Sequence, residues 1–321
     1  MKISILGLGA YAIALAKVFE ENDNKVCMWS KYKDEVDIVK LKRENPNLLP
    51  GVKLSKSTFV TNDMEECVKN AKIIVLAVPM NAVREVSREL SKFLDNDQVI
   101  CLVSKAIEQN TNKLLSDVVY EETKSDNICM LSGPSFAMEL ASNEKVGLIA
   151  ASSSNVARMA LKVCLENEHV IVDASKDIIG VQLCAICKNI YGIMLGIMYG
   201  MKFSKSTIAS NFAKVTNDLR IILEVLGGKE YTIFTYAGIG DLLLTCMNEE
   251  SRNFKFGYEL GSGKTLNEVL ELNKGKTVEG IYSVEAIYNL LNLREVNIKS
   301  IDIMYDILVR GMDAKNVEKY M

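Results

Sequence analysis

The sequence predicts an α/β protein, with a doubly wound parallel sheet in its N-terminal half and an all-helical C-terminal half. In the first half, short apolar segments alternate with helical ones, the pattern of a parallel sheet covered by helices. A glycine-rich turn at 7–12 follows the first apolar segment. Strand signals stop near Ile178, and long helical stretches follow. A chain of 321 residues is long enough for two domains, which we place at 1–175 and 176–321.

The individual elements follow from apolar periodicity and turn residues, taken in chain order. The expected strands of the first half are 2–6, 25–30, 72–78, 98–104 and 127–132, with weaker ones at 146–151 and 169–173. The helices between them are 12–22, 64–71, 81–94, 111–124 and 154–166, and a polar, basic segment follows the second strand. The helices of the second half are 178–201, 206–226, 238–247, 252–261, 265–273, 279–292 and 299–310.

Composition and charge narrow the class of partner. The net charge of −3 lacks the basic signature of proteins that bind nucleic acid or anionic membranes, so neither is an expected partner. Met1 and Lys2 lead straight into an apolar strand without a secretory signal, which favours a cytoplasmic location. The longest apolar stretch, 178–201, is interrupted by Gln182, Lys188 and Asn189. We interpret it as a buried helix and expect no stable membrane insertion.

The eight cysteines are scattered, as small buried apolar residues would be in a reducing compartment. Cys184 and Cys187 form one C-x-x-C pair, but no second pair and no histidine cluster completes a zinc site. We therefore predict no metal centre.

The turn Gly7-Leu8-Gly9-Ala10-Tyr11-Ala12 fits the dinucleotide-binding fingerprint of Rossmann-type sheets, with alanine in the third glycine position. Gly7 permits the tight turn, and Gly9 lets the backbone approach a pyrophosphate. Ala12 keeps the following helix close to the strand, and the helix N-terminus attracts the anion. Because the motif follows a strand and opens a helix, it predicts binding of NAD or NADP.

The end of the second strand carries no acid of the kind that binds the 2′-hydroxyl of NAD. It reads Trp29-Ser30-Lys31-Tyr32-Lys33, and Asp34 comes only afterwards. Ser30 and Lys31 suit a 2′-phosphate, so the sequence slightly favours NADP over NAD.

Lys188 is the leading candidate for acid–base chemistry. Burial in an apolar helix lowers the pKa of a lysine, which makes it a usable proton donor or acceptor near neutral pH. The alternative is that its side chain reaches water at the edge of the helix. His169 is the only histidine, and no acid is suggestively spaced from it, so a histidine mechanism is disfavoured.

Other candidates lie near strand ends or helix starts. Lys105 and the loop 132–136 follow strands of the predicted sheet, where ligands bind, although either could be an ordinary loop. Arg252 begins a helix and could bind a phosphate, or be a solvated surface residue. Asp241 could cap a helix or orient a catalytic lysine.

Taken together, these residues resemble the bacterial type of NAD(P)-dependent sn-glycerol-3-phosphate dehydrogenases along nearly the whole chain. The matching segments, in the order of the family, are GLGAYAIALA at 7–16, NLLPG at 47–51, AVP at 77–79, SKAIE at 104–108, LSGPSFAMELA at 131–141, GVQLCAICKN at 180–189, GIGDLLLTC at 238–246, SRNFKFGYELG at 251–261 and VEG at 278–280.

The resemblance implies a function and a set of site residues. It implies reduction of dihydroxyacetone phosphate to sn-glycerol 3-phosphate for glycerophospholipid synthesis, with Lys188 exchanging the proton of the C2 hydroxyl. The residues implied around the reacting end are Lys105, Asn189, Asp241 and Thr245. Those implied for the substrate phosphate are Gly133, Ser135, Ser251, Arg252 and Asn253. Those implied for the dinucleotide are Ala10 and Tyr11 of the fingerprint and, outside it, Lys31, Lys105, Ala137, Arg252, Thr277 and Glu279.

The sequence departs from the family in three places. Tyr11-Ala12 stands where bacterial members have Trp-Gly, Ala106 replaces a glycine, and 199–220 lacks the usual Gly-x-Asn…Ala-Ala…Arg-Gly run. The last departure affects part of the substrate wall and the contacts of an expected homodimer. Two alternatives stay open: a lysine-dependent β-hydroxyacid dehydrogenase, which shares the two-domain plan, and a cofactor-binding protein without catalysis, which the altered 199–220 segment allows.

Overall fold

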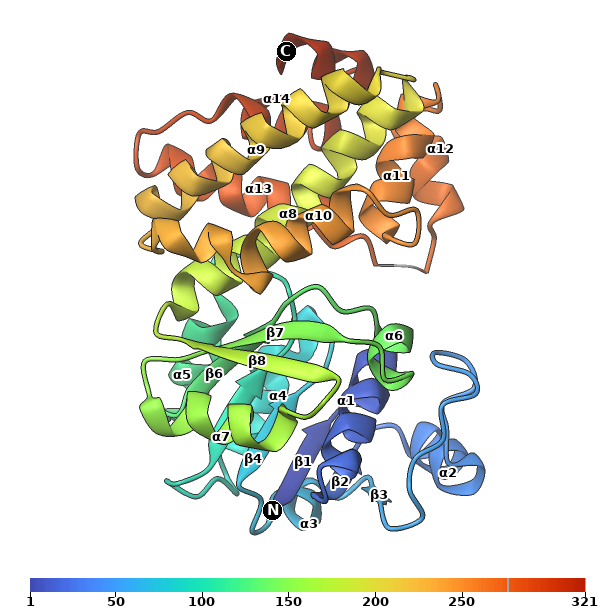
Figure 1. Cartoon of the computed structure of the whole chain (residues 1–321), viewed down its shortest axis with the longest axis vertical. Helices are drawn as coiled ribbons and strands as arrows, with labels where there is room; N and C mark the ends of the chain where they lie inside the picture. The colour runs from blue at the N-terminus through green and yellow to red at the C-terminus, as the bar shows by residue number, and fades with distance from the viewer. Residues whose placement is uncertain (276, 321) are drawn as a thin grey trace. The chain divides into compact units, whose positions relative to one another are not determined.

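The computed structural model describes residues 1–275 and 277–320. It divides into two compact units. Unit 1 comprises Met1–Ser104 and Lys113–Ile178, and unit 2 comprises Lys105–Asn112 and the chain from Ile179 onward. The α/β sheet lies wholly in unit 1, and unit 2 is helical (Figure 1). The predicted fold class is therefore confirmed.

Unit 1 is built on an eight-stranded sheet with the strand order β3-β2-β1-β4-β5-β6-β7-β8. The strands are β1 Lys2–Leu6, β2 Lys25–Trp29, β3 Phe59–Thr61, β4 Ile73–Leu76, β5 Val99–Leu102, β6 Ile128–Ser132, β7 Val146–Ala151 and β8 Val170–Ser175. Neighbouring strands are parallel except for β6 and β7. The order reverses at β1 and β4, which is where doubly wound sheets bind their ligands.

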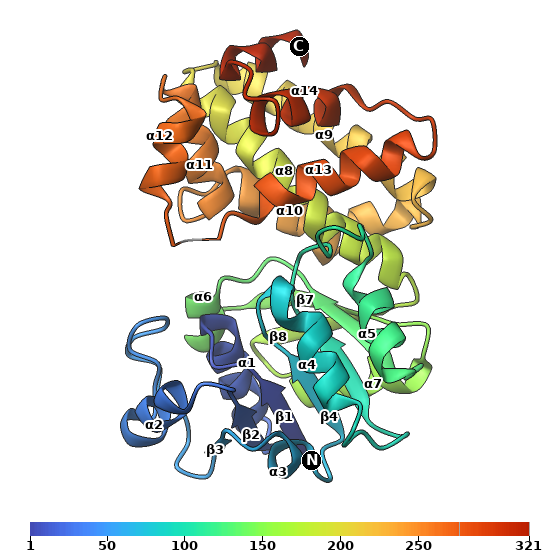
Figure 2. The same cartoon turned by 180° about the vertical axis from the view of Figure 1, so that it is seen from behind.

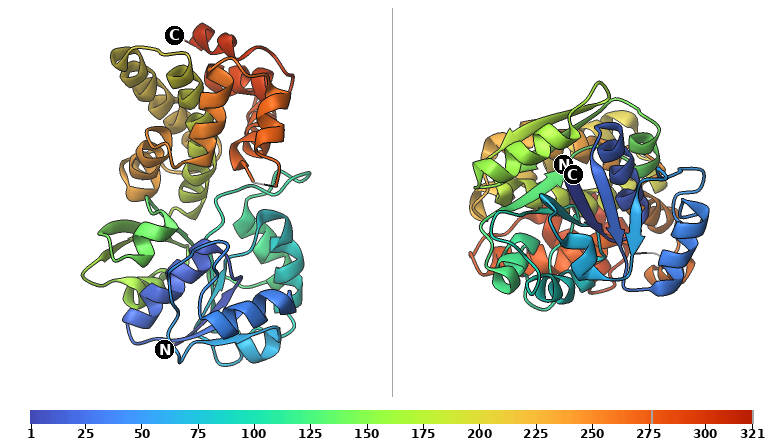
Figure 3. Two further views of the ribbon diagram at one scale, coloured as in Figure 1. Left: turned by 90° about the vertical axis from the view of Figure 1, so that its right-hand side faces the viewer. Right: turned by 90° about the horizontal axis from the view of Figure 1, so that it is seen from below.

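Helices cover both faces of this sheet, as the view from below in Figure 3 shows. Helices α1 and α7 lie over the face seen in Figure 1, and α4 and α5 over the face seen in Figure 2. The helices of unit 1 are α1 Ala10–Glu21, α2 Lys33–Lys42, α3 Met64–Val68, α4 Val83–Leu90 (after a 3₁₀ turn, Met80–Ala82), α5 Leu115–Thr123, α6 Ala137–Ala141 and α7 Asn155–Leu165.

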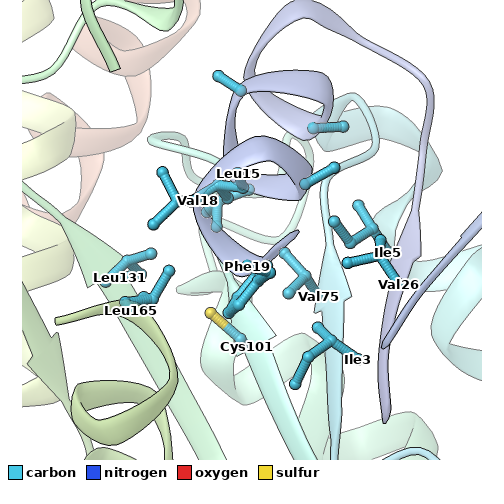
Figure 4. Packing of buried hydrophobic residues seen from close by; sticks show 14 of the residues in the cluster. Ile3, Ile5, Leu15, Val18, Phe19, Val26, Val75, Cys101, Leu131 and Leu165 are labelled. Atoms are coloured by element: carbon cyan, nitrogen blue, oxygen red, sulfur yellow. The ribbon is translucent and has the colours of Figure 1, made fainter. Parts of the chain in front are cut away.

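The core under α1 follows from the apolar face of that helix. Leu15, Val18 and Phe19 belong to the same buried apolar cluster as Ile5 and Val75 of the sheet, and Phe19 lies next to Val75 (Figure 4). All five side chains are at most 1% exposed. This packing fixes the start of α1, and with it the glycine-rich turn, against the strands.

Three short elements of unit 1 were not predicted. Helix α2 lies in the segment that we interpreted only as polar and basic. It was missed because only Val36 and Val39 of its ten residues are buried, which gives a weak apolar periodicity. The others, β3 and α6, have three and five residues, too few for a periodic signal. The predicted parallel arrangement holds for every neighbouring pair of strands except β6 and β7. The five residues of α6 span only about 8 Å, too short to return the chain along β6, so β7 enters antiparallel.

Unit 2 contains helices close to those predicted. They are α8 Ile178–Gly200, α9 Lys205–Val225, α10 Asp241–Cys246, α11 Arg252–Gly261, α12 Leu266–Leu272, α13 Glu279–Asn292 and α14 Lys299–Leu308, with 3₁₀ turns at Glu230–Phe234 and Ala314–Tyr320. The predicted helix 238–247 is in fact two elements, because a wide π-type turn, Tyr236–Gly240, precedes α10.

Helix α8 runs through the middle of unit 2 (Figure 1). It is long and apolar enough to cross a membrane by length and composition alone, but 89% of its most apolar window is buried inside the protein. The interpretation of 178–201 as a buried helix is therefore confirmed.

Candidate active site

The fingerprint turn of unit 1 has the geometry that a dinucleotide requires. Gly7 has φ +131°, and a methyl group there would lie 2.4 Å from the carbonyl oxygen of Ala77, so only glycine fits. Gly9 precedes α1, and a methyl group there would meet no protein atom within 4 Å, which leaves the backbone accessible to a pyrophosphate. Ala12 is buried on the sheet. The residues present therefore fit NAD or NADP.

Polar groups at the end of β2 form a small network. The Ser30 hydroxyl donates to the carboxylate of Glu35 at 2.7 Å and accepts from the Tyr32 N–H at 3.2 Å. The Lys31 ammonium lies 3.8 Å from the carboxylate of Glu85. Sequence reasoning missed both acids, because Glu35 comes five residues after the strand and Glu85 belongs to α4.

The loop after β6 lies beside the fingerprint helix. The hydroxyls of Tyr11 and Ser135 are 3.0 Å apart, and Ala10, Tyr11 and Ala137 pack against the same apolar core. Gly133 has φ +148°, and a methyl group there would lie 2.5 Å from the Gly147 carbonyl oxygen, so glycine is again required.

In unit 2, two lysines share one carboxylate. The ammonium groups of Lys188 and Lys105 each lie 2.6 Å from a different oxygen of Asp241. The Lys188 side chain is 10% exposed and that of Asp241 1%. The alternative in which Lys188 extends to water is therefore wrong. The structure brings together three predicted residues that are up to 136 positions apart.

The π-type turn before α10 places Asp241 in this cluster. Gly238 sits inside the turn, where a methyl group would lie 2.2 Å from the Ile233 carbonyl oxygen. Asp241 is then the first residue of α10, where the helix dipole stabilises a negative charge. It orients two lysines and does not act as a simple cap.

Burial and neighbouring charges shift the pKa values of Lys188 and Glu279. The pKa of Lys188 is lowered to about 8: desolvation lowers it, the charge of Asp241 opposes this shift, and the positive charge of Lys105 adds to it. Burial raises the pKa of the Glu279 carboxyl, against the attraction of Arg252, Lys188 and Lys105. Lys188 can thus gain and lose a proton near neutral pH.

A closed ring of hydrogen bonds joins α8, α11 and α13. Asn189 donates to the Glu279 carboxylate at 3.0 Å, and its own carbonyl oxygen accepts from the Asn253 amide at 2.9 Å. The Asn253 oxygen in turn accepts from the N–H of Gly280 at 3.0 Å. Asn189 also donates to the Lys105 carbonyl oxygen at 3.3 Å. The ring thus fixes Asn189, the residue next to Lys188, against helices α11 and α13.

Glycines allow these helices to approach so closely. A methyl group on Gly257 or Gly261 of α11 would lie 2.0 Å from a carbonyl oxygen of α8, and one on Gly196 would lie 2.3 Å from a carbonyl oxygen of α11. A methyl group on Gly280 of α13 would lie 2.7 Å from the Asn189 carbonyl oxygen. Sequence reasoning missed this role, although G-x-x-x-G spacing in α8 and α11 signals close helix packing.

The remaining predicted residues of unit 2 lie around the start of α11 and α13. Ser251 caps α11 through the Phe254 N–H, and Arg252 is exposed at the first helical position. Thr245 is buried against Gly192 of α8. Thr277 is exposed just ahead of α13.

Cys184 and Cys187 are buried in α8, and no group of three or more potential ligands occurs in the part of the chain that the structure describes.

Two family profiles match this chain. NAD-dependent glycerol-3-phosphate dehydrogenase N-terminus spans residues 2–158, and NAD-dependent glycerol-3-phosphate dehydrogenase C-terminus spans residues 177–319. The glycerol-3-phosphate dehydrogenase (NAD(P)+) of Bacillus subtilis is 33% identical over 324 residues, 100% of this chain and 94% of that protein. That of Fusobacterium nucleatum is 32% identical over 317 residues, 98% of this chain and 94% of that protein. The crystal structure of glycerol-3-phosphate dehydrogenase from Coxiella burnetii has a TM-score of 0.92 and 29% identity, covering 99% of this chain and 98% of that one.

The fingerprint turn and the buried lysine cluster, on this fold, define an oxidoreductase that uses a nicotinamide dinucleotide. Within that class, the chain belongs to the NAD-dependent glycerol-3-phosphate dehydrogenase family. The resemblance found in the sequence is confirmed.

Proposed function

We propose that this chain reduces dihydroxyacetone phosphate to sn-glycerol 3-phosphate with NADH or NADPH. The observation that carries the proposal is the pair of lysines, Lys188 and Lys105, held at 2.6 Å on the carboxylate of Asp241. A buried ammonium with a pKa of about 8 is suited to giving a proton to an alkoxide. The relatives from Bacillus subtilis and Fusobacterium nucleatum, which this chain matches over 94% of their length, carry the name of this activity.

In this proposal the bound cofactor supplies the hydride, and the chain handles the proton and the charge. The Lys188 ammonium donates its proton to the oxygen on C2 as negative charge grows there. Lys105 adds a second positive charge near the same oxygen. Asp241 keeps both ammonium groups in place, and in the reverse direction neutral Lys188 accepts the proton.

The start of α11 is the proposed anchor for the substrate phosphate. Exposed Arg252 and the first N–H groups of this ten-residue helix attract a dianion. Ser251 and Asn253 contribute through the backbone of that turn, since the Asn253 oxygen and one amide hydrogen are already bonded within the ring. Gly133 and Ser135 are further proposed contacts of the substrate, and Asn189 and Thr245 support the reacting end.

The proposed cofactor residues lie in both units. In unit 1 they are Gly7, Gly9, Ala10, Tyr11, Ala12, Ser30, Lys31 and Ala137. In unit 2 they are Lys105, Arg252, Thr277 and Glu279. We propose residues 1–175, which carry the fingerprint, as the dinucleotide-binding domain and residues 176–321 as the substrate-binding and catalytic domain. We also propose a cytoplasmic homodimer that supplies glycerophospholipid synthesis.

A spectrophotometric assay tests the proposal. NADH and NADPH oxidation should be followed with dihydroxyacetone phosphate, with unphosphorylated dihydroxyacetone and with a β-keto acid as acceptors. We expect turnover with the phosphate ester alone. Turnover with the β-keto acid alone would select a β-hydroxyacid dehydrogenase, and tight cofactor binding without any oxidation would select a non-catalytic protein.

A further inference from the structure

The end of β2 holds acids that its sequence does not predict. Ser30 is the first residue after the strand, the place from which dinucleotide-binding sheets contact the adenosine ribose. Glu35 reaches the same point from the first turn of α2, because its carboxylate accepts from the Ser30 hydroxyl at 2.7 Å. An acid therefore stands where NAD-binding proteins have one, although it comes from the helix and not from the strand.

Three hydrogen-bond donors at this point, two backbone N–H groups and the Ser30 hydroxyl, already have acceptors within the chain. The Ser30 N–H donates to the Thr61 carbonyl oxygen at 3.3 Å, and the Ser30 hydroxyl hydrogen is directed to Glu35. The Tyr32 N–H donates to the Ser30 oxygen at 3.2 Å. A 2′-phosphate needs donors, since its oxygens only accept, whereas a ribose hydroxyl can both donate and accept.

The nearby lysine is partly neutralised as well. The Lys31 ammonium lies 3.8 Å from Glu85 and 5.4 Å from the centroid of the Tyr32 ring. This pair is exposed and weak, so it dampens the attraction for a phosphate without abolishing it. Glu35 is exposed as well, but its carboxylate is held by a 2.7 Å hydrogen bond from Ser30, which is only 5% exposed, so Glu35 is the better fixed of the two acids.

We infer that Glu35, held on Ser30, selects NADH over NADPH in this chain. Its carboxylate accepts a hydrogen bond from the ribose 2′-hydroxyl of NADH and repels the 2′-phosphate of NADPH. The inference deepens the proposed function, since it concerns the cofactor of that reaction. It reverses the preference that Ser30 and Lys31 suggest in the sequence alone.

The test compares Glu35→Gln with a matched control. Glutamine keeps the size of the side chain and an oxygen that accepts from Ser30, and it removes only the charge. Asp34→Asn makes the same change of charge one residue earlier, at an exposed position of the same turn. The Ser30→Ala variant removes the group that holds Glu35 at the strand end.

Affinities for NADH and NADPH should be measured by the fluorescence of the bound nicotinamide, at low and moderate salt. Displacement of NADH by ADP and by 2′,5′-ADP then confines the effect to the adenosine end. We expect the native chain to bind NADH more tightly than NADPH. In Glu35→Gln the ratio of the two dissociation constants should shift towards NADPH by at least about tenfold. The affinity for 2′,5′-ADP should rise in this variant, and the affinity for ADP should not. Ser30→Ala should shift it in the same direction by less, and Asp34→Asn should leave it within about twofold.

A native preference for NADPH, an unchanged ratio in Glu35→Gln, or an equal shift in Asp34→Asn would each overturn the inference. These binding measurements require no turnover. Failure of the chain to reduce dihydroxyacetone phosphate would therefore contradict the proposed function and leave the inference on Glu35 standing.

Discussion

The fingerprint turn of unit 1 and the lysine cluster of unit 2 are built in opposite ways. The turn is local: six consecutive residues, with glycine required at Gly7 by a backbone contact, make the anion-binding start of α1. The cluster is assembled from distant parts of the chain, since Lys105, Lys188 and Asp241 come from a loop, a long helix and the start of the short helix α10. Binding of a common cofactor can thus depend on a short motif, while the proposed proton transfer depends on how a whole helical unit packs.

The largest effect is expected from Asp241→Asn. The variant leaves two ammonium groups without their shared carboxylate, and the pKa of Lys188 falls further because Asp241 raises it. We expect kcat for ketone reduction to fall by about 10²–10³-fold, with the basic limb of the pH profile moved to lower pH. Cofactor affinity should change little.

The control for this variant is Glu249→Gln, which makes the same change of charge at an exposed position of unit 2. An Asp241→Asn protein with normal kcat and an unmoved pH profile would contradict the role given to the shared carboxylate.

The next effect concerns the close helix packing behind the cluster. In Gly257→Ala, the added methyl group would lie 2.0 Å from the Ile193 carbonyl oxygen, so α11 must move away from α8. We expect the free energy of unfolding to fall by about 3 kcal/mol, measured by urea denaturation. Lys255→Ala, on the exposed side of the same helix, should change it by less than about 0.5 kcal/mol. Equal effects would show that the glycine contact is not needed.

A smaller loss of stability is expected from breaking the ring of hydrogen bonds that joins α8, α11 and α13. Asn253→Ala leaves the Gly280 N–H and the Asn189 side-chain oxygen without their partners, and we expect the two losses together to lower the free energy of unfolding by about 2 kcal/mol, the lower end for two buried groups. Thermal unfolding should show the loss, and the KM for the substrate should rise because α11 is no longer fixed. Asn292→Ala, at an exposed position of α13, serves as the control. A normal melting temperature for Asn253→Ala would contradict the ring.

The smallest effect belongs to unit 1. Tyr11→Phe removes the hydroxyl that lies 3.0 Å from Ser135, which is one bond of a partly exposed pair. We expect the KM for dihydroxyacetone phosphate to rise by about two- to fivefold with kcat unchanged, in line with about 0.5–1 kcal/mol for a hydrogen bond of this kind. Tyr120→Phe, on the exposed side of α5, should have no effect. A large loss of kcat in Tyr11→Phe would contradict the role in substrate binding alone that is proposed for this hydroxyl.

The same contrast explains what the sequence could predict. The fingerprint turn, the helix at 178–201 and the lysine within it follow from local spacing and apolar periodicity. Asn189 and Asn253 are 64 positions apart, and no pattern announces that their side chains meet. Glu35 was missed because the acid expected on the strand comes from a helix with only two buried residues. The π-type turn before Asp241 was missed because it reads as a continuous helix.

The pH dependence of turnover in both directions tests the central claim, that buried Lys188 carries the proton. Ketone reduction needs the ammonium form, so its kcat should fall as pH rises through about 8, and oxidation of glycerol 3-phosphate needs the amine, so its kcat should rise over the same range. In Lys188→Ala, kcat should fall by about 10²–10⁴-fold and should no longer change with pH around 8 in either direction, while the cofactor should still bind. Lys188→Ala with native turnover and the same two limbs would contradict the account.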